Sequence, residues 1–149
     1  MFLDAQTLLW DAAALTADAA STNTYDTGAA GNDISVGQGL ALVIQVDVAA
    51  DFTTGDETYK FQVIQSAAAN LGTPDILVEV PFTNALAQTL LAIGKIIVVP
   101  IPPGSITKRY IGAYFDGGGT TPTITVTAWI TPQSMIQRDK YYADAITIS

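Results

Sequence analysis

The chain of 149 residues contains no cysteine and no histidine. Without cysteine it forms no disulfide and offers no thiolate for a metal ion or for nucleophilic attack. Without histidine it lacks the commonest general base and the commonest transition-metal ligand. Histidine-dependent triads and dyads and zinc fingers are therefore excluded. We expect a protein that is not an enzyme and that has no catalytic residue, no metal site and no cofactor.

Charged residues are also scarce, at 13% of the chain, about half the usual share. Six Lys and Arg stand against 14 Asp and Glu, which gives a net charge of −8 and a pI near 4.1. Binding nucleic acid requires clustered Lys and Arg, and anionic membranes repel an acidic surface. We therefore expect no nucleic-acid and no membrane partner. A thinly charged surface is either covered by uncharged polar residues or partly buried in an assembly.

Residues 1–20 are apolar but do not match a signal peptide, because no Lys or Arg follows Met1 and because Asp4 and Asp11 interrupt the run. No apolar run is long enough to span a bilayer. We expect a soluble chain that is not secreted by the usual route. The local structure is open: residues 8–15 fit one face of a helix, whereas residues 13–19 alternate as in a strand.

From residue 25 onward, apolar and polar residues alternate between frequent turn residues, which predicts β-structure. Residues 26–39 are rich in glycine and are expected to be mostly loop. Residues 84–93 fit either a short helix that ends at Gly94 or a connection. A group of three prolines ends the run 96–101, because proline cannot donate to a sheet ladder. The strands are predicted at 40–48, 59–65, 76–82, 96–101, 108–115, 122–130 and 143–148.

The segments 108–115 and 122–130 form the clearest pair, joined by a predicted hairpin loop at 116–121. The second segment carries threonine at alternate positions, which predicts an exposed threonine row on one sheet face. Several short strands with Gly, Pro and Asn turns predict an all-β fold, an antiparallel β-sandwich of jelly-roll type. We expect one domain over residues 1–149, because no repeat or linker composition divides the chain.

Acidic residues raise two kinds of chemistry. Asp51, Asp56 and Glu57 share a loop with Gly55, but their spacing does not match the twelve-residue EF-hand calcium loop. A solvated acidic turn explains them, because turns favour Asp and Gly for local reasons. A glycosidase needs two paired carboxylates, and no such pair stands out around Glu57 or Glu79.

Large aromatic residues and the apolar N-terminus are the candidates for an interface. Trp129 falls on the threonine side of its strand, which predicts either an exposed recognition aromatic or packing under a neighbouring segment. Arg109 is suited to clamp a partner's carboxylate, and ordinary surface charge is the plainer interpretation. The predicted interface residues are Phe2, Leu3, Leu9, Trp10, Trp129, Tyr141 and Tyr142.

The order of several short motifs resembles the cement, or decoration, proteins of tailed-phage capsids. The likeness is greatest to the family typified by the cement protein of a Bordetella podophage, and it runs along almost the whole chain. The motifs are MFLDAQ at 1–6, STNTYD at 21–26, LALVIQVDV at 40–48, TYKFQ at 58–62, PIPPG at 100–104, KRYIG at 108–112, TITVTAW at 123–129 and YYAD at 141–144.

This resemblance implies a jelly-roll protein without enzymatic activity that sits outside an HK97-type shell as an oligomer and bridges neighbouring major capsid proteins. Its partners are then itself, as a homodimer or homotrimer, and the major capsid protein. It is made in the host cytoplasm and located on the outer capsid surface of the virion. The resemblance favours an extended N-terminal segment over a helix. The alternative is a carbohydrate-binding or lectin-like β-sandwich, which predicts a cleft lined by aromatic residues, often with calcium.

Overall fold

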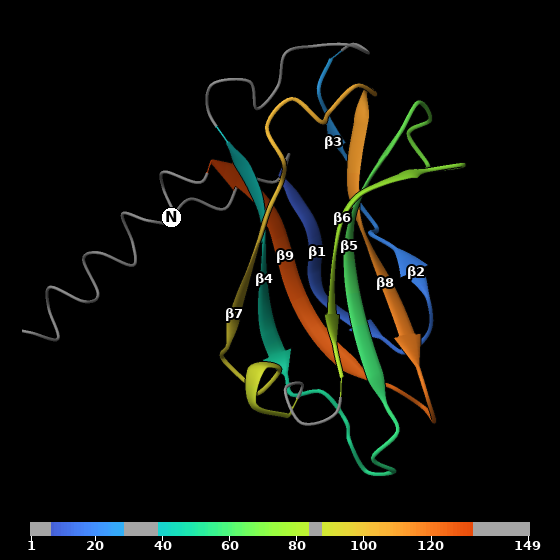
Figure 1. Ribbon diagram of the computed structural model, residues 1–149, viewed down its shortest axis with the longest axis vertical. Helices are drawn as coiled ribbons and strands as arrows, with labels where there is room; N and C mark the ends of the chain where they lie inside the picture. The colour runs from blue at the N-terminus through green and yellow to red at the C-terminus, as the bar shows by residue number, and fades with distance from the viewer. Residues whose placement is uncertain (1–6, 29–38, 84–87, 133–149) are drawn as a thin grey trace, which may run out of the picture.

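The computed structural model describes residues 7–28, 39–83 and 88–132, which form an antiparallel β-sandwich (Figure 1). Residues 88–90 are helical, and within the described ranges no helix has the length and apolar character needed to cross a membrane. The predicted strand at 143–148 lies outside the described residues. The strands are β1 (Leu8–Leu15), β2 (Ala19–Ala20), β3 (Tyr25–Asp26), β4 (Leu40–Val48), β5 (Thr58–Ser66), β6 (Asp75–Phe82), β7 (Ile96–Pro100), β8 (Tyr110–Gly118) and β9 (Ile124–Pro132).

Two sheets pack face to face in this sandwich. One has the strand order β1-β9-β4-β7, and the other has the order β2-β8-β5-β6, with β3 also pairing with β8. Because β2 and β3 both pair with β8, they act as one interrupted strand. Each strand then lies in the opposite sheet from its predecessor, except in the β5–β6 hairpin. This interleaving gives the two four-stranded sheets of a jelly roll, so the predicted fold class is confirmed.

The predicted hairpin between the last two described strands is wrong. β8 pairs with β5, whereas β9 lies between β1 and β4 in the other sheet. The connection at 119–123 therefore crosses between the sheets. Residue alternation correctly located both strands, but it reports which face is buried and not which strand lies alongside.

Inward-facing side chains from both sheets fill one core. The ring of Phe61 lies at its centre, with its centroid 5.6 Å from that of Phe115 and 6.2 Å from that of Phe82. Burying each such ring stabilises the fold by about 1.5–3 kcal/mol. The largest fully buried side chains include Trp10, Leu42, Ile44, Tyr59, Phe61 and Phe115.

The N-terminal segment is extended where it is described, as the resemblance implied, and it pairs with β9 as a sheet strand. Two register shifts interrupt this pairing, one on each side of Trp10. Ala12 takes a positive φ of 46° at the second shift, and its N–H donates to the Thr127 hydroxyl at 3.1 Å. That hydroxyl donates in turn to Asp47 at 2.5 Å. The bulged edge strand is thus linked, through the Thr127 hydroxyl of β9, to Asp47 of β4.

The threonine row of β9 is less exposed than predicted. Thr123 is exposed, Thr125 and Thr127 are half-buried, and Thr131 is buried. The reason is position, because β9 lies inside its sheet with a strand on either side. Uncharged polar cover is therefore present on this face, but only part of the row contacts solvent.

Candidate interaction surface

Two of the predicted interface residues, Leu9 and Trp10, lie in the core of the sandwich. The Trp10 ring meets Phe61 edge to face, with centroids 6.5 Å apart. Both side chains point inward because the first register shift of β1 breaks the strict alternation of the strand. They stabilise the fold of the single chain and offer no contact surface there.

Trp129 is also buried, with 4% of its surface exposed. Its strand partners are Leu8 in β1 and Val43 in β4. Of the two interpretations drawn from the sequence, the single chain therefore favours packing over an exposed aromatic. The remaining predicted residues, Phe2, Leu3, Tyr141 and Tyr142, lie outside the described residues. The assignment of all seven residues to an interface stays a prediction.

The acidic loop between β4 and β5 is built around a buried carboxylate. Glu57 has 0% of its surface exposed, so the prediction of a solvated turn is wrong for this residue. Its carboxylate accepts hydrogen bonds from the Thr54 hydroxyl, from the Thr54 N–H at 3.0 Å and from the Gly55 N–H at 2.8 Å. The Thr54 hydroxyl contributes most to holding the pKa of Glu57 below its usual value, with burial opposing. The carboxylate thus caps its own turn.

Neighbouring polar groups tie this loop to the β8–β9 connection. Asp56 accepts from the Thr120 N–H at 3.1 Å and from its hydroxyl at 2.9 Å, and these bonds, the N–H first, lower the pKa of Asp56. The Tyr59 hydroxyl donates to the Asp51 carbonyl at 2.6 Å and accepts from the Thr123 N–H at 3.2 Å. Within the described ranges, no three acidic side chains gather as they would around a metal ion.

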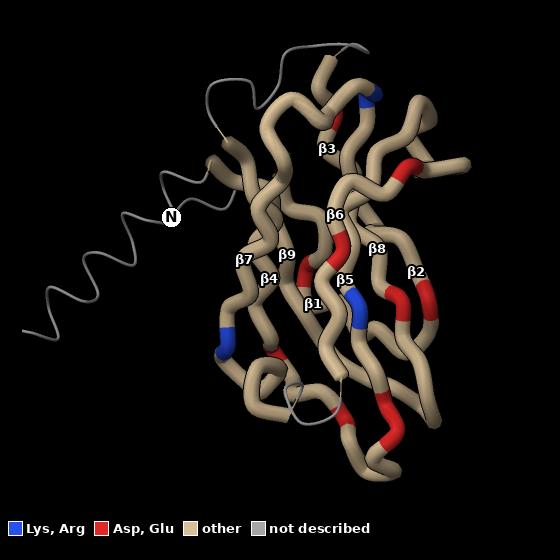
Figure 2. The backbone as a smooth tube through the Cα atoms, viewed as in Figure 1, with Lys and Arg blue, Asp and Glu red and all other residues tan. Residues whose placement is uncertain are grey.

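A charged row lies on the outer face of the second sheet, where acidic positions outnumber basic ones (Figure 2). Lys60 of β5 lies 3.2 Å from Asp116 of β8 and 4.0 Å from Glu79 of β6. The hydrogen bond that Lys60 donates to Asp116 is the main cause that raises the pKa of Lys60. Glu79 also accepts from the Gln62 amide at 2.7 Å. The three ionised groups are therefore engaged with one another across three strands.

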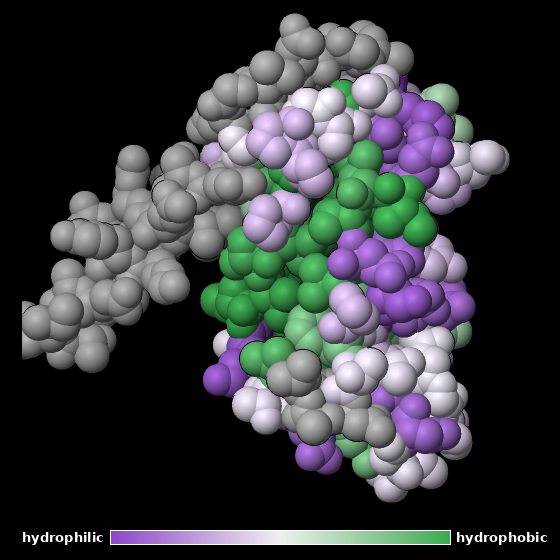
Figure 3. Space-filling model, in the orientation of Figure 1, coloured by the Kyte–Doolittle hydropathy of each residue, from purple (hydrophilic) through white to green (hydrophobic). Residues whose placement is uncertain are grey.

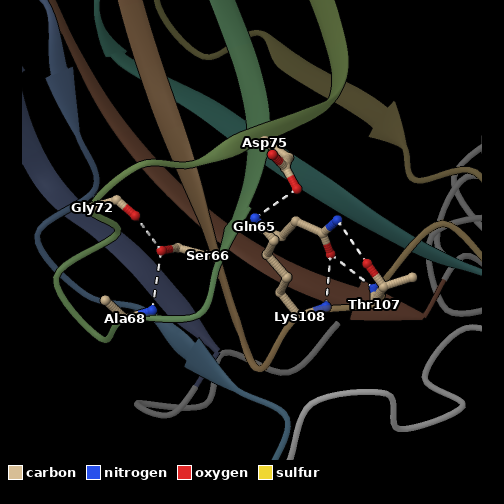
Figure 4. A network of polar contacts seen from close by, with 7 residues as sticks. All are labelled: Gln65, Ser66, Ala68, Gly72, Asp75, Thr107 and Lys108. Atoms are coloured by element: carbon tan, nitrogen blue, oxygen red, sulfur yellow. Dashed lines mark hydrogen bonds and ion pairs between the residues drawn. The ribbon is translucent and has the colours of Figure 1, made fainter.

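Two further cations are paired within the chain. The Lys108 ammonium lies 2.7 Å from the Asp75 carboxylate. Beside this pair, the side-chain amide oxygen of the buried Gln65 accepts a hydrogen bond from the Lys108 backbone N–H at 3.1 Å (Figure 4). Arg109 makes a two-point contact with Asp26, at 2.8 and 3.0 Å. Hydrogen bonding from the Arg109 guanidinium is the main cause that lowers the pKa of Asp26. Arg109 thus clamps a carboxylate of its own chain, and it fastens β3 to the start of β8.

The surface around β7 is apolar and exposed. β7 is an edge strand, and its Ile96 and Val98 side chains are 56% and 39% exposed. Ile93, in the turn before β7, is 71% exposed. Hydrophobic residues gather over this strand on the side where the edges of the two sheets meet (Figure 3). Lys95 is exposed at the start of β7 and makes no ion pair within the described residues. We call Ile93, Lys95, Ile96 and Val98 the β7 patch.

The sequence interpretation did not assign the β7 patch. It identified residues 96–101 as a strand, but an apolar β-branched run fits a buried strand as well as an edge strand. Pro100 is a signal that could have identified the edge strand, because proline within a strand is found mainly at the edge of a sheet. The interface prediction rested on aromatic residues instead, since tryptophan and tyrosine are enriched at interfaces.

A comparison with protein-family models places the chain among known proteins. The model of the family named Bbp16 matches residues 9–130, which include every described strand except the first residue of β1 and the last two of β9. The chain belongs to the Bbp16 family. The name suggests a Bordetella phage protein, so the match supports the resemblance drawn from the sequence motifs. A search of curated proteins gave no match.

Proposed function

We propose that the protein is a non-enzymatic structural protein that binds the outside of a phage capsid as an oligomer and stabilises contacts between major capsid proteins. The observation that carries this proposal is the Bbp16 family match over residues 9–130. The jelly-roll fold agrees with the proposal without deciding it, because both viral capsid and lectin domains use this architecture. The proposal places the protein on the outer surface of the virion after its synthesis in the host cytoplasm.

The use of the carboxylates supports a structural role. Glu57 accepts hydrogen bonds from its own loop, Asp56 accepts from Thr120 of the β8–β9 connection, and Glu79 lies between Gln62 and Lys60. Catalytic carboxylates, in contrast, are arranged around a cleft, with environments that push their pKa values apart. Here the pKa values of Asp56 and Glu57 are both lowered. Both groups therefore stay ionised at neutral pH, and neither is set up as a general acid.

The stabilising effect would come from mass action. A protein that binds assembled capsid subunits better than separated ones shifts the equilibrium toward the closed shell. Each contact can be weak, because many copies act together on one shell. The net charge of −8 keeps the free copies soluble until they bind.

The test uses shells of the phage that encodes the protein, purified without it. The purified protein should co-sediment with these shells in a fixed ratio, appear on their outer surface by electron cryomicroscopy, and raise the temperature at which they come apart. Failure to bind such shells, or binding that leaves their disassembly temperature unchanged, would overturn the proposal. The matched control is the shell of a related phage whose virions do not contain this protein.

No observation favours the carbohydrate-binding alternative. A sugar-binding face stacks aromatic side chains against the sugar rings. Within the described residues, however, every Trp and Phe is buried or half-buried, and the exposed large hydrophobic residues are all aliphatic. A glycan array would expose this alternative directly, since saturable binding to one sugar class would count against the cement function.

A further inference from the structure

The hydrogen bonds of β7 show which of its backbone groups are unused. The Ile101 N–H donates to the Leu40 carbonyl, and the Val46 N–H donates to the Lys95 carbonyl, both at 2.9 Å. In the register of this antiparallel pair, the backbone N–H and C=O groups of Ile97 and Val99 point to the same side as these bonds, toward β4. Because bonded positions alternate along an antiparallel strand, the odd-numbered residues of β7 face β4.

The even-numbered residues therefore direct their backbone groups toward the open edge. Ile96 and Val98 each present an N–H and a C=O there, and Pro100 presents a C=O alone because it has no N–H. β7 is the last strand of its sheet within the described residues. An exposed edge of this kind is a template for another strand, and here apolar side chains accompany it at Ile96 and Val98.

Charge favours a second copy of the chain as the partner. Each copy carries −8, so two copies repel over most of their surfaces. Between Glu79 and Asp116, however, the sequence contains no acidic residue, and this stretch includes β7 and the turn before it. The β7 patch, with Lys95 as its only charge, is thus a place where two acidic copies can approach without juxtaposing carboxylates.

Symmetry gives the same answer. Two identical antiparallel strands pair about a two-fold axis and use the same surface of both copies, which closes the assembly at two. Full overlap of the five residues of β7 places Val98 opposite Val98 of the other copy. In this register each Val98 N–H meets the other Val98 C=O, and each Ile96 N–H meets the other Pro100 C=O. The missing proline N–H therefore removes only the return bond of each of the two Ile96–Pro100 pairs.

We infer that the β7 patch is the surface through which two copies of this protein form a two-fold dimer, joining their four-stranded sheets edge to edge. The inference rests on the proposed function, because it names the surface behind the oligomer invoked there. It also ranks the homodimer above the homotrimer. The dimer axis passes beside Val98, and Ile93 and Ile96 flank it on each copy.

The first test is the mass in solution of the full chain. Sedimentation velocity should give about 31 kDa, twice the 15.6 kDa of one chain, and the dimer should strengthen as salt screens the like charges. Ile96→Lys should raise the dimer dissociation constant at least about 100-fold, because the substitution occurs twice across the axis. Ile76→Lys is the matched control, since Ile76 is also 56% exposed but lies in β6 of the other sheet.

Two further variants address the backbone and the register. Val98→Pro removes an N–H that bonds nothing within the described part of the single chain, so it should abolish the dimer while the circular dichroism spectrum stays unchanged. Val98→Cys introduces the only thiol of the chain. Hydrogen-bonded antiparallel pairs lie about 5.5 Å apart at Cα, within disulfide range. Oxidation should therefore link two copies covalently, whereas Ile76→Cys should not.

Several results would overturn the inference: a monomer or trimer at all concentrations, a dimer indifferent to Ile96→Lys, or equal losses for Ile96→Lys and Ile76→Lys. A dimer that survives Ile96→Lys while capsid binding is lost would assign the β7 patch to the capsid instead. The shell-binding assay keeps the two proposals apart. A monomer that still binds and stabilises shells refutes the dimer alone, and a β7-linked dimer that binds no shell refutes the capsid function alone.

Discussion

Replacing Tyr59 with Phe should destabilise the end of the sandwich where the β4–β5 loop meets the β8–β9 connection. The Tyr59 ring is fully buried, and Phe preserves its packing against Phe52 and Phe115. The hydroxyl alone is lost, and with it the bonds to the Asp51 carbonyl and the Thr123 N–H. The change therefore isolates the polar link between the two loops.

The expected cost follows from those two bonds. A typical intramolecular hydrogen bond contributes about 0.5–1.5 kcal/mol net, and a buried group left without a partner costs more. Asp51 is half-buried and Thr123 is exposed, so water can reach both freed groups. We therefore expect a loss of about 1–2 kcal/mol rather than the full penalty, which corresponds to about 2–8 °C in melting temperature for a domain of this size.

Urea unfolding followed by tryptophan fluorescence measures this loss, at one fixed protein concentration so that any self-association contributes equally. Tyr114→Phe is the control, because Tyr114 is half-buried on the outer face of β8 and its hydroxyl makes no hydrogen bond to another described residue. It should change the free energy of unfolding by less than about 0.5 kcal/mol. Equal effects of the two substitutions would refute the role assigned to the Tyr59 hydroxyl.

Three further predictions concern the same loops and the β3 contact. Gly119→Ala should destabilise the fold more than Gly55→Ala. Both glycines have a φ above 80°, but only at Gly119 would the new Cβ lie 2.2 Å from a backbone carbonyl oxygen. Equal urea midpoints for the two variants would contradict this prediction. The pKa of Glu57 is lowered on folding, so its stabilisation is present above the unfolded pKa of about 4.3 and is lost as the pH falls through the folded value. The stability difference between the parent and Glu57→Gln should therefore shrink below about pH 4, and a difference that stays constant down to pH 2 would argue against it. Arg109→Lys should lower the melting temperature by less than half the Tyr59→Phe shift, since Arg109 and Asp26 are each close to half exposed. A larger decrease of the melting temperature would contradict the small contribution to stability assigned to this ion pair.

The fold class was predictable because each strand has one buried face. The run at 40–48 alternates so regularly that its predicted bounds match those of β4. Pairing was not predictable in the same way. In a jelly roll most neighbours in a sheet are distant in sequence, so the local turn signal at 116–121 gave the wrong partner for β8.

The candidate surface was harder to predict for a related reason. Burial of Leu9 and Trp10 depends on a bulge in β1, which shifts the alternation by one residue and has no reliable sequence signature. Exposure of Ile96 and Val98 depends on β7 being the last strand of its sheet. Both facts belong to the assembled sandwich, and neither is contained in the residues around those positions.

The pairing of β1 with β9 has a consequence for synthesis in the cell. Leu8 pairs with Trp129, which the ribosome adds 121 residues later. At about 5–20 residues per second, that interval lasts about 6–24 s. Throughout it, Leu9 and Trp10 belong to a strand whose neighbour does not yet exist. The sandwich therefore closes only after β9 has been synthesised, and its first apolar strand depends for several seconds on the nascent chain staying soluble.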